Sequence, residues 1–148
     1  MRKLSYFLAV VLLFGFASCE EVENLNKDKF TFTLDGESID YSGKADYGTL
    51  EESGEKIIRG RETDSLGLVI YVPEFRETRY TSEAHDVSIL YTVEDNVYIC
   101  GESAGSMEVD IDSYEEGKRI EGTFSGTLVE LIGEGSIEIK DGEFRVNN

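Results

Sequence analysis

Apolar and polar residues alternate along most of the chain from residue 29 onward, which is the pattern of β-strands with one buried face. The segment LGLVIYV at 66–72 differs because it carries apolar residues on both faces, as strands in the middle of a sheet do. Pro73 follows it and lacks the backbone N–H that a strand needs. We therefore predict a central strand that ends before Pro73.

A tight β-hairpin is predicted around Asp35-Gly36, a dipeptide that favours a type I′ turn. A two-residue loop pairs Leu34 with Glu37. The same register puts Phe32 opposite Ile39, so that apolar residues fall on one face and polar residues on the other.

A second hairpin is predicted around Asp141-Gly142 by the same reasoning. Here the two-residue loop pairs Lys140 with Glu143. It also places Glu138 opposite Arg145, which is a favourable cross-strand charge pair.

Further strands continue this alternation, and glycines at 122 and 126 on an inward face predict a bend or a bulge. No segment after the N-terminus has a helical period. The whole predicts an all-β fold, either an antiparallel β-sandwich or an up-and-down β-barrel of about 9–11 strands, in a single domain at 29–148. The additional strands are expected at 44–52, 55–62, 87–93, 97–100, 107–112 and 119–131.

The first 18 residues have the organisation of a secretory signal peptide. Arg2 and Lys3 precede an apolar run at 4–16. As a helix this run is about 20 Å long, which is too short for the ~30 Å hydrocarbon core of a bilayer.

The signal ends in FASC at 16–19, which resembles the lipobox of bacterial lipoproteins: an apolar residue, two small residues and a cysteine. The resemblance implies cleavage before Cys19 and attachment of diacylglycerol to its thiol, with acylation of the new amine. Two or more acyl chains hold a protein stably on a membrane. The other interpretation is an ordinary signal peptide followed by a chance cysteine.

The segment 19–28 is polar and acidic, which predicts a flexible tether. Glu20 and Glu21 directly follow Cys19 and resemble the surface-export signal of lipoproteins from the Bacteroidetes phylum. This resemblance implies an outer-membrane anchor that faces the exterior of the cell.

The rest of the chain resembles small uncharacterised lipoproteins of the Bacteroidetes cell envelope. The resemblance lies in FTFTLDG at 30–36, GTFS at 122–125 and DGEF at 141–144. These motifs consist of turn and core residues. The resemblance implies an all-β envelope lipoprotein and transfers no catalytic residue.

The chain is strongly acidic, with a formal charge of −17 over 148 residues. Without the predicted signal peptide, 31 acidic and 12 basic residues remain, and the charge becomes −19. Such a surface repels nucleic acid, so no nucleic-acid partner is expected. A hydrophobic content of 40% argues against disorder.

Cys100 and His85 are candidates for a nucleophile and its base, with Asp86 beside the histidine. Cys100 ends an apolar strand, where a free thiol usually acts as a small hydrophobic side chain. With Cys19 acylated, Cys100 has no disulfide partner in the chain.

Acidic residues alternate along 107–112, opposite an apolar face. Such oxygen ligands suit Ca²⁺. They are also what the solvent-exposed face of an acidic protein contains, and no EF-hand spacing is present, so no metal or cofactor is assigned. The candidate ligands are Glu108, Asp110 and Asp112, joined by Glu121 if 113–118 is a hairpin loop.

Eight tyrosines suggest a carbohydrate-binding surface as a further alternative. Three of them, Tyr71, Tyr91 and Tyr98, lie in apolar strands and are expected in the core. Four others lie nearer strand ends or loops and are the candidates for exposure, namely Tyr41, Tyr47, Tyr80 and Tyr114.

From the sequence we expect a non-catalytic binding or accessory module that is held at the outer membrane through acyl chains on Cys19. The alternative is a structural subunit of a surface assembly. A thiol-dependent hydrolase that uses Cys100 and His85 is the third hypothesis.

Overall fold

The computed structural model describes residues 27–63, 65–84, 86–101 and 104–148. The predicted signal peptide, Cys19, Glu20, Glu21 and His85 lie outside the described residues. Within the part that is described, no helix has the length and apolar character needed to cross a bilayer.

Eleven strands in the described residues form one antiparallel sheet, and a short 3₁₀ turn, η1 (Ser82–Ala84), follows the sixth. This confirms the all-β prediction. The strands are β1 (Lys29–Leu34), β2 (Glu37–Asp40), β3 (Ala45–Thr49), β4 (Lys56–Thr63), β5 (Leu66–Val72), β6 (Thr78–Thr81), β7 (Ser88–Val93), β8 (Asn96–Cys100), β9 (Ser106–Glu115), β10 (Arg119–Glu130) and β11 (Ser136–Asn147).

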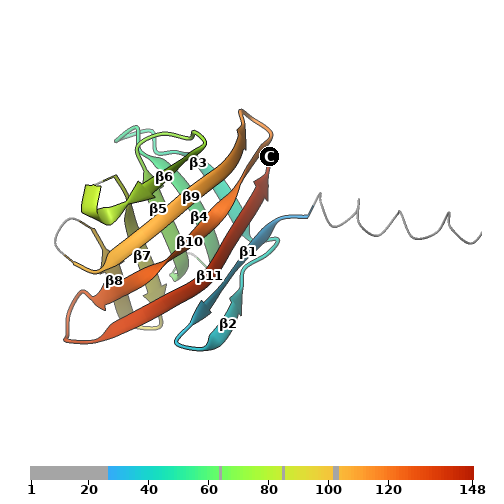
Figure 1. The fold of residues 1–148 in the computed structure, drawn as a ribbon. Coiled ribbons are helices and arrows are strands. Elements are labelled where there is room, and N and C mark those ends of the chain that lie inside the picture. Colours follow the sequence, from blue (N-terminus) through green and yellow to red (C-terminus); the bar gives the residue numbers. More distant parts are fainter. Residues whose placement is uncertain (1–26, 64, 85, 102–103) are drawn as a thin grey trace, which may run out of the picture.

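The sheet curls into a half-barrel with a front layer and a rear layer (Figure 1). Strands β2, β1, β11, β10, β9 and β6 form the front layer, and β8, β7, β5, β4 and β3 form the rear layer. Strand β10 joins the two, because it pairs with β9 along most of its length and with β8 at Val129 and Glu130. The fold therefore combines features of the two predicted architectures: it has two layers, as a β-sandwich has, and one continuous sheet, as a β-barrel has.

The core fills the space between the layers, and the alternation along each strand determines which side chains enter it. In β9, for example, Met107, Val109 and Ile111 are at most 4% exposed, while Glu108 points outward. The predicted strand at 66–72 is confirmed as β5, which lies between β4 and β7.

The first predicted hairpin is confirmed. Leu34 pairs with Glu37, and Phe32 pairs with Ile39. Asp35 has a φ of 46°, as the first central residue of a type I′ turn requires.

The second predicted hairpin is wrong. Strand β11 runs straight through Asp141-Gly142, where it contains a β-bulge. Between Lys140 and Glu143 the register shifts against β1, and the neighbouring shift against β10 lies between Ile139 and Gly142. Asp141 has a positive φ of 51°, which occurs in β-bulges as well as in type I′ turns.

The charge pair predicted across that hairpin is also wrong. Arg145 pairs with Glu121 on β10, and its Nε donates to the Glu121 carboxylate at 3.0 Å. Glu138 instead forms an ion pair with Lys140 on its own strand, at 2.7 Å.

The inward glycines of β10 lie at irregularities of the sheet, as predicted. The register shifts at Gly122 against β9 and near Gly126 against β11. A Cβ atom on Gly122 would lie 2.1 Å from the carbonyl oxygen of Asp110 and 2.7 Å from the ring of Phe144. No side chain fits at this position.

Strand β6 was not predicted, and it buries a tyrosine that was expected to be exposed. Tyr80 is 2% exposed, and its hydroxyl donates to the carbonyl of Glu74 at 2.9 Å. Tyr41 is 6% exposed, which also corrects the prediction. The hydroxyl group of Tyr41 is hydrogen-bonded to Tyr91. Both buried tyrosines therefore have a hydrogen-bond partner inside the protein.

Candidate functional site

The outer face of the rear layer, which points away from the core, is largely apolar. It arises because β5 and its neighbours carry apolar residues on both faces. We call it the Tyr71 face. Its apolar members are Ile57, Leu66, Val69, Tyr71, Leu90, Val97, Ile99, Val129 and Leu131, and all except Ile57 retain some exposure.

One row of this face crosses four adjacent strands without a polar residue. Val69 on β5 pairs with Leu90 on β7, and Leu90 pairs with Ile99 on β8. Ile99 in turn pairs with Val129 on β10. At the β4 end the row meets Arg59, the partner of Val69. Large contiguous apolar patches are rare on the surface of soluble monomeric proteins and mark interaction sites.

Tyr71 lies in the next row, between Ile57 on β4 and Ser88 on β7. The prediction that Tyr71 belongs to the core is wrong, whereas Tyr91 is buried as predicted, at 2% exposure. Ile57 is only 3% exposed although it lies outside the core cluster, so its neighbours on the outer face cover it. Sequence alternation assigns Tyr71 to this face, since it is out of phase with Leu68 and Ile70.

Three hollows of the surface meet at Tyr71. One of about 330 Å³ has polar walls that include Glu55, Asp86 and Ser88. A second, of about 370 Å³, extends over Leu90 and Ile99. The third is a groove of about 170 Å³ that follows β4 and β5. Concave surface that combines apolar side chains with a few polar groups is typical of binding sites.

The charges of the face are gathered at its β4 end. The Arg59 Nε donates to the Asp46 carboxylate at 2.6 Å, and an Arg61 nitrogen lies 3.6 Å from the other oxygen of the same carboxylate. Both guanidinium groups therefore contact the carboxylate of Asp46.

At the opposite end, the turn between β10 and β11 projects two apolar side chains into solvent. Leu131 is 55% exposed and Ile132 is 89% exposed. The backbone N–H of Leu131 donates to the carbonyl of Val97 at 2.8 Å. A 2.8 Å backbone bond between Glu130 and Gly135 closes the turn. We call Leu131 and Ile132 the apolar tip.

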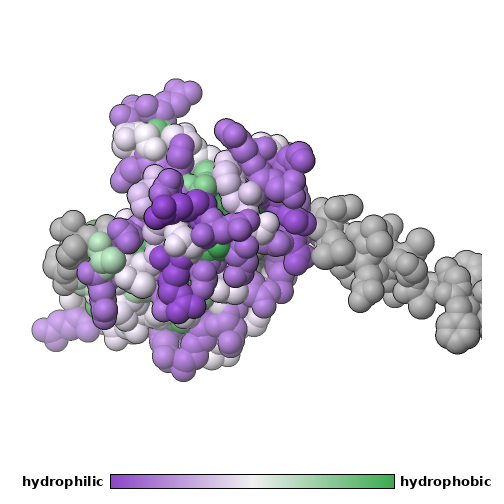
Figure 2. Space-filling model, turned by 45° about the horizontal axis from the view of Figure 1, so that its top comes forward, coloured by the Kyte–Doolittle hydropathy of each residue, from purple (hydrophilic) through white to green (hydrophobic). Residues whose placement is uncertain are grey.

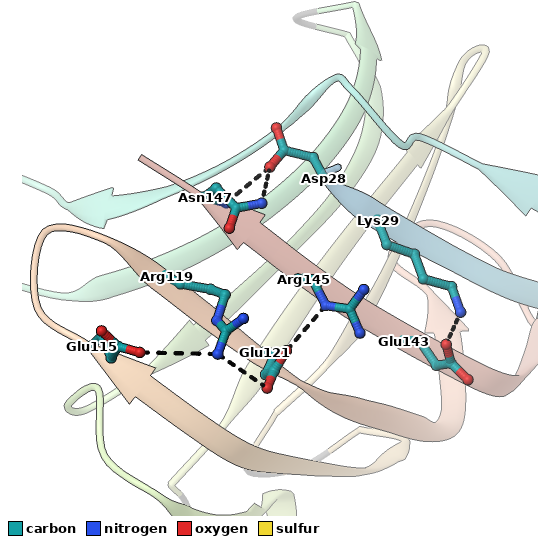
Figure 3. A network of polar contacts seen from close by, with 8 residues as sticks. All are labelled: Asp28, Lys29, Glu115, Arg119, Glu121, Glu143, Arg145 and Asn147. Atoms are coloured by element: carbon teal, nitrogen blue, oxygen red, sulfur yellow. Dashed lines mark hydrogen bonds and ion pairs between the residues drawn. The ribbon is translucent and has the colours of Figure 1, made fainter. Parts of the chain in front are cut away.

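The outer face of the front layer is polar and contrasts with the Tyr71 face. The front and upper sides of the molecule are mostly hydrophilic, with a small apolar area near the middle (Figure 2). A row of ion pairs crosses this face from Glu115 through Arg119 and Glu121 to Arg145 (Figure 3).

The candidate calcium ligands lie on this polar face but do not converge. Arg79 binds Glu108 at 3.2 Å and Asp110 at 2.8 Å. Glu121 lies opposite Ser113 and binds Arg145. Among the described residues, no group of three or more acidic, histidine or cysteine side chains has the geometry to hold a metal ion.

A hollow of about 460 Å³ lies over the same polar face. Glu108, Asp110 and Glu143 line it, together with Thr123 and Lys140. These three carboxylates form ion pairs with basic side chains of the same chain. A ligand in this hollow would have to compete with those ion pairs.

Cys100 points into the core and is 2% exposed. Burial raises the pKa of its thiol, and a hydrogen bond with Ser82 offsets this only in part. A buried thiol with a raised pKa is a poor nucleophile at neutral pH. His85, its predicted base, lies outside the described residues.

An aromatic cluster packs at one end of the half-barrel, between the two layers. The ring of Phe75 lies 5.5 Å from Tyr47 and 5.3 Å from Tyr114, and Lys56 lies 6.0 Å above the Phe75 ring. Tyr47 and Tyr114 were expected to be exposed, and they are half-buried. Burial raises the pKa of Tyr47, whose hydroxyl has no hydrogen-bond partner among the described residues.

Comparison of the chain with protein-family models, curated proteins and solved structures finds no match.

Proposed function

We propose that this protein is a lipid-anchored, non-catalytic binding module of the cell envelope that acts through the Tyr71 face. The anchor is Cys19, the membrane is the outer membrane, and Glu20 and Glu21 direct the protein to the exterior. The partner that binds the Tyr71 face is another protein surface.

The observation that carries this proposal is the unbroken apolar row from Val69 to Val129, with three hollows around Tyr71 beside it. Apolar surface in water is unfavourable by about 25 cal/mol per Å², and a protein surface of matching shape removes this cost. A face of this kind therefore favours protein association over catalysis.

The attachment of the tether is consistent with display on a membrane. The Asp28 carboxylate accepts hydrogen bonds from the Asn147 backbone at 2.8 Å and from its side chain at 3.0 Å (Figure 3). These bonds fix the start of β1 to the end of β11. The Tyr71 face belongs to the rear layer, whereas β1 and β11 belong to the front layer (Figure 1).

The alternative, a structural subunit of a surface assembly, is favoured by the apolar tip, since Ile132 is 89% exposed. The hydrolase hypothesis has the weakest support, because Cys100 is buried and its pKa is raised.

Site-specific photo-crosslinking in living cells tests the binding surface. Leu90, at the centre of the face, is replaced with p-benzoylphenylalanine in the full chain, and Thr123 on the front layer serves as the matched control. We expect a discrete adduct from position 90 and none from position 123. Uncross-linked protein alone at both positions would refute the proposal.

The anchor is tested separately by intact mass of the membrane fraction and by protease shaving of whole cells. Cleavage before Cys19 with added acyl chains, together with loss of the protein on shaving, is the expected result. An unacylated soluble product would show that the protein is secreted without an anchor.

A further inference from the structure

We infer that the protein partner of the Tyr71 face is basic, and that it inserts an arginine side chain into the hollow that Tyr71, Glu55 and Asp86 line. This inference rests on the proposed function, because it names the chemistry of the partner that binds the same face. It follows from how the hollow is built and from which carboxylates of the chain lack a basic partner.

The hollow exists because small residues stand next to Tyr71 in the sheet. Tyr71 on β5 pairs with Ser88 on β7, and a Cβ atom on Gly101 would lie 3.9 Å from the Cβ of Ser88. Neither neighbour has a side chain large enough to cover the Tyr71 ring, which is half-buried. Pro73 ends β5 and forms another part of the wall. The hollow, of about 330 Å³, therefore has room for one long side chain.

Two carboxylates in the wall of this hollow, Glu55 and Asp86, have no ion pair with a basic side chain of the described residues. Glu55 accepts a hydrogen bond from the Ser53 hydroxyl at 2.8 Å. The Leu50 N–H donates to the Glu55 carbonyl at 2.9 Å, and the Asp86 N–H donates to the Thr81 carbonyl at 3.3 Å. Because these bonds hold the backbone at both carboxylates, binding a cation there costs little conformational entropy.

The front layer differs, because basic side chains of the same chain bind its carboxylates. The ion-paired carboxylates of that layer include Glu108, Asp110, Glu115, Glu121, Glu138 and Glu143. Around the Tyr71 face, by contrast, the described carboxylates without an ion pair lie at the hollow and in the β7–β8 and β10–β11 turns, namely Glu55, Asp86, Glu94, Asp95 and Glu134. At the β4 end, Arg59 and Arg61 both contact Asp46. Three borders of the face are therefore acidic, and a basic partner complements them.

An arginine side chain matches the chemistry of the hollow. Its aliphatic stem can pack on Tyr71 and Pro73, while its planar guanidinium group stacks on aromatic rings and donates several hydrogen bonds to carboxylates. A metal ion needs more ligands than this, and the described residues contain no group of three that could hold one. The charge of −17 also attracts a basic protein over a distance.

The neighbouring hollow indicates what stands beside the arginine on the partner. This second hollow, of about 370 Å³, extends over Leu90 and Ile99 and shares Tyr71, Ser88 and Gly101 with the first. Its floor is apolar, so an apolar side chain is the expected occupant. The partner therefore presents an arginine next to an apolar residue.

Nuclear magnetic resonance titration of the full chain that carries Cys19→Ser tests the hollow with a defined probe. The probe is acetyl-leucyl-arginyl-leucinamide, and the matched control is the same peptide with citrulline, which has nearly the shape of arginine but no charge. We expect the arginine peptide to shift the backbone amide signals of Tyr71, Ser88 and Gly101, with an affinity at least about tenfold higher than that of the citrulline peptide. No binding of the arginine peptide, or equal binding of the two peptides, would overturn the inference.

Photo-crosslinking at Leu90 in living cells tests the same charges with the native partner. Glu55→Gln and Asp86→Asn are combined in the full chain, and both side chains are exposed, so this variant retains the fold. We expect the yield of the adduct to fall at least about tenfold. Glu37→Gln combined with Asp112→Asn is the matched control, because it removes two exposed carboxylates from the front layer and should leave the yield unchanged.

The two proposals fail separately. If the adduct from Leu90 forms equally well in the Glu55→Gln, Asp86→Asn variant, the arginine inference is wrong and the proposed function stands. If Leu90 yields no adduct even in the parent chain, both are wrong.

Discussion

At the scale of single residues, Tyr91 shows how burial couples one hydroxyl group to the stability of the fold. It is 2% exposed and hydrogen-bonded to Tyr41, and burial raises its pKa well above the usual value of 10.0. The folded state therefore holds Tyr91 neutral, while the unfolded state releases its proton near pH 10.0.

We predict from this that stability falls as the pH rises above 10.0, since only the unfolded chain gains from ionising this tyrosine. Below that pH the contribution is fully present. Urea unfolding between pH 8 and pH 11 measures the effect, and Tyr91→Phe should flatten the dependence. An equally steep loss in Tyr91→Phe would show that other groups cause it.

A second prediction concerns Gly122, where a Cβ atom would lie 2.1 Å from a backbone oxygen. Gly122→Ala forces β9 and β10 apart, so we expect a loss of about 1–3 kcal/mol in the free energy of unfolding. Gly48→Ala is the matched control, because nothing lies within 4 Å of its Cβ position. Equal midpoints of urea unfolding for the two variants would contradict the packing described here.

At the scale of elements, β11 shows where sequence reasoning succeeds and where it fails. The side-chain alternation predicts correctly that Ile139 and Phe144 both face the core. It does not distinguish a hairpin from a bulge, because a two-residue turn and one extra residue change the alternation in the same way. The neighbouring strands favour the bulge, because β10 and β1 pair with β11 on both sides of Asp141.

The bulge predicts different results for two changes at Asp141. Asp141→Gly retains the positive φ of 51° and should leave stability within about 0.5 kcal/mol of the parent. Deletion of Asp141 removes the extra residue and turns Phe144 and Val146 toward solvent, at a cost of about 3–6 kcal/mol. Denaturant unfolding of both variants measures this, and a stable deletion variant would disprove the bulge.

At the scale of the whole molecule, the candidate site is assembled from strands that are far apart in the sequence. The sequence predicts that β5 is apolar on both faces, and this is confirmed. It does not show that Val69, Leu90, Ile99 and Val129 form one row, because that depends on the pairing of β10 with β8. The sequence places Tyr71 in the core for a related reason, because an apolar strand alone does not reveal which of its two faces the rest of the protein covers.

The central claim is that the Tyr71 face is covered by protein in its native setting. Hydroxyl-radical footprinting of the full chain in native membranes tests this most directly, with the purified Cys19→Ser chain at nanomolar concentration as the reference. The account predicts that Tyr71 and Leu90 are protected in the membrane, while exposed positions of the front layer such as Glu143 are labelled equally in both samples. Equal labelling of Tyr71 and Leu90 in the two samples would contradict it.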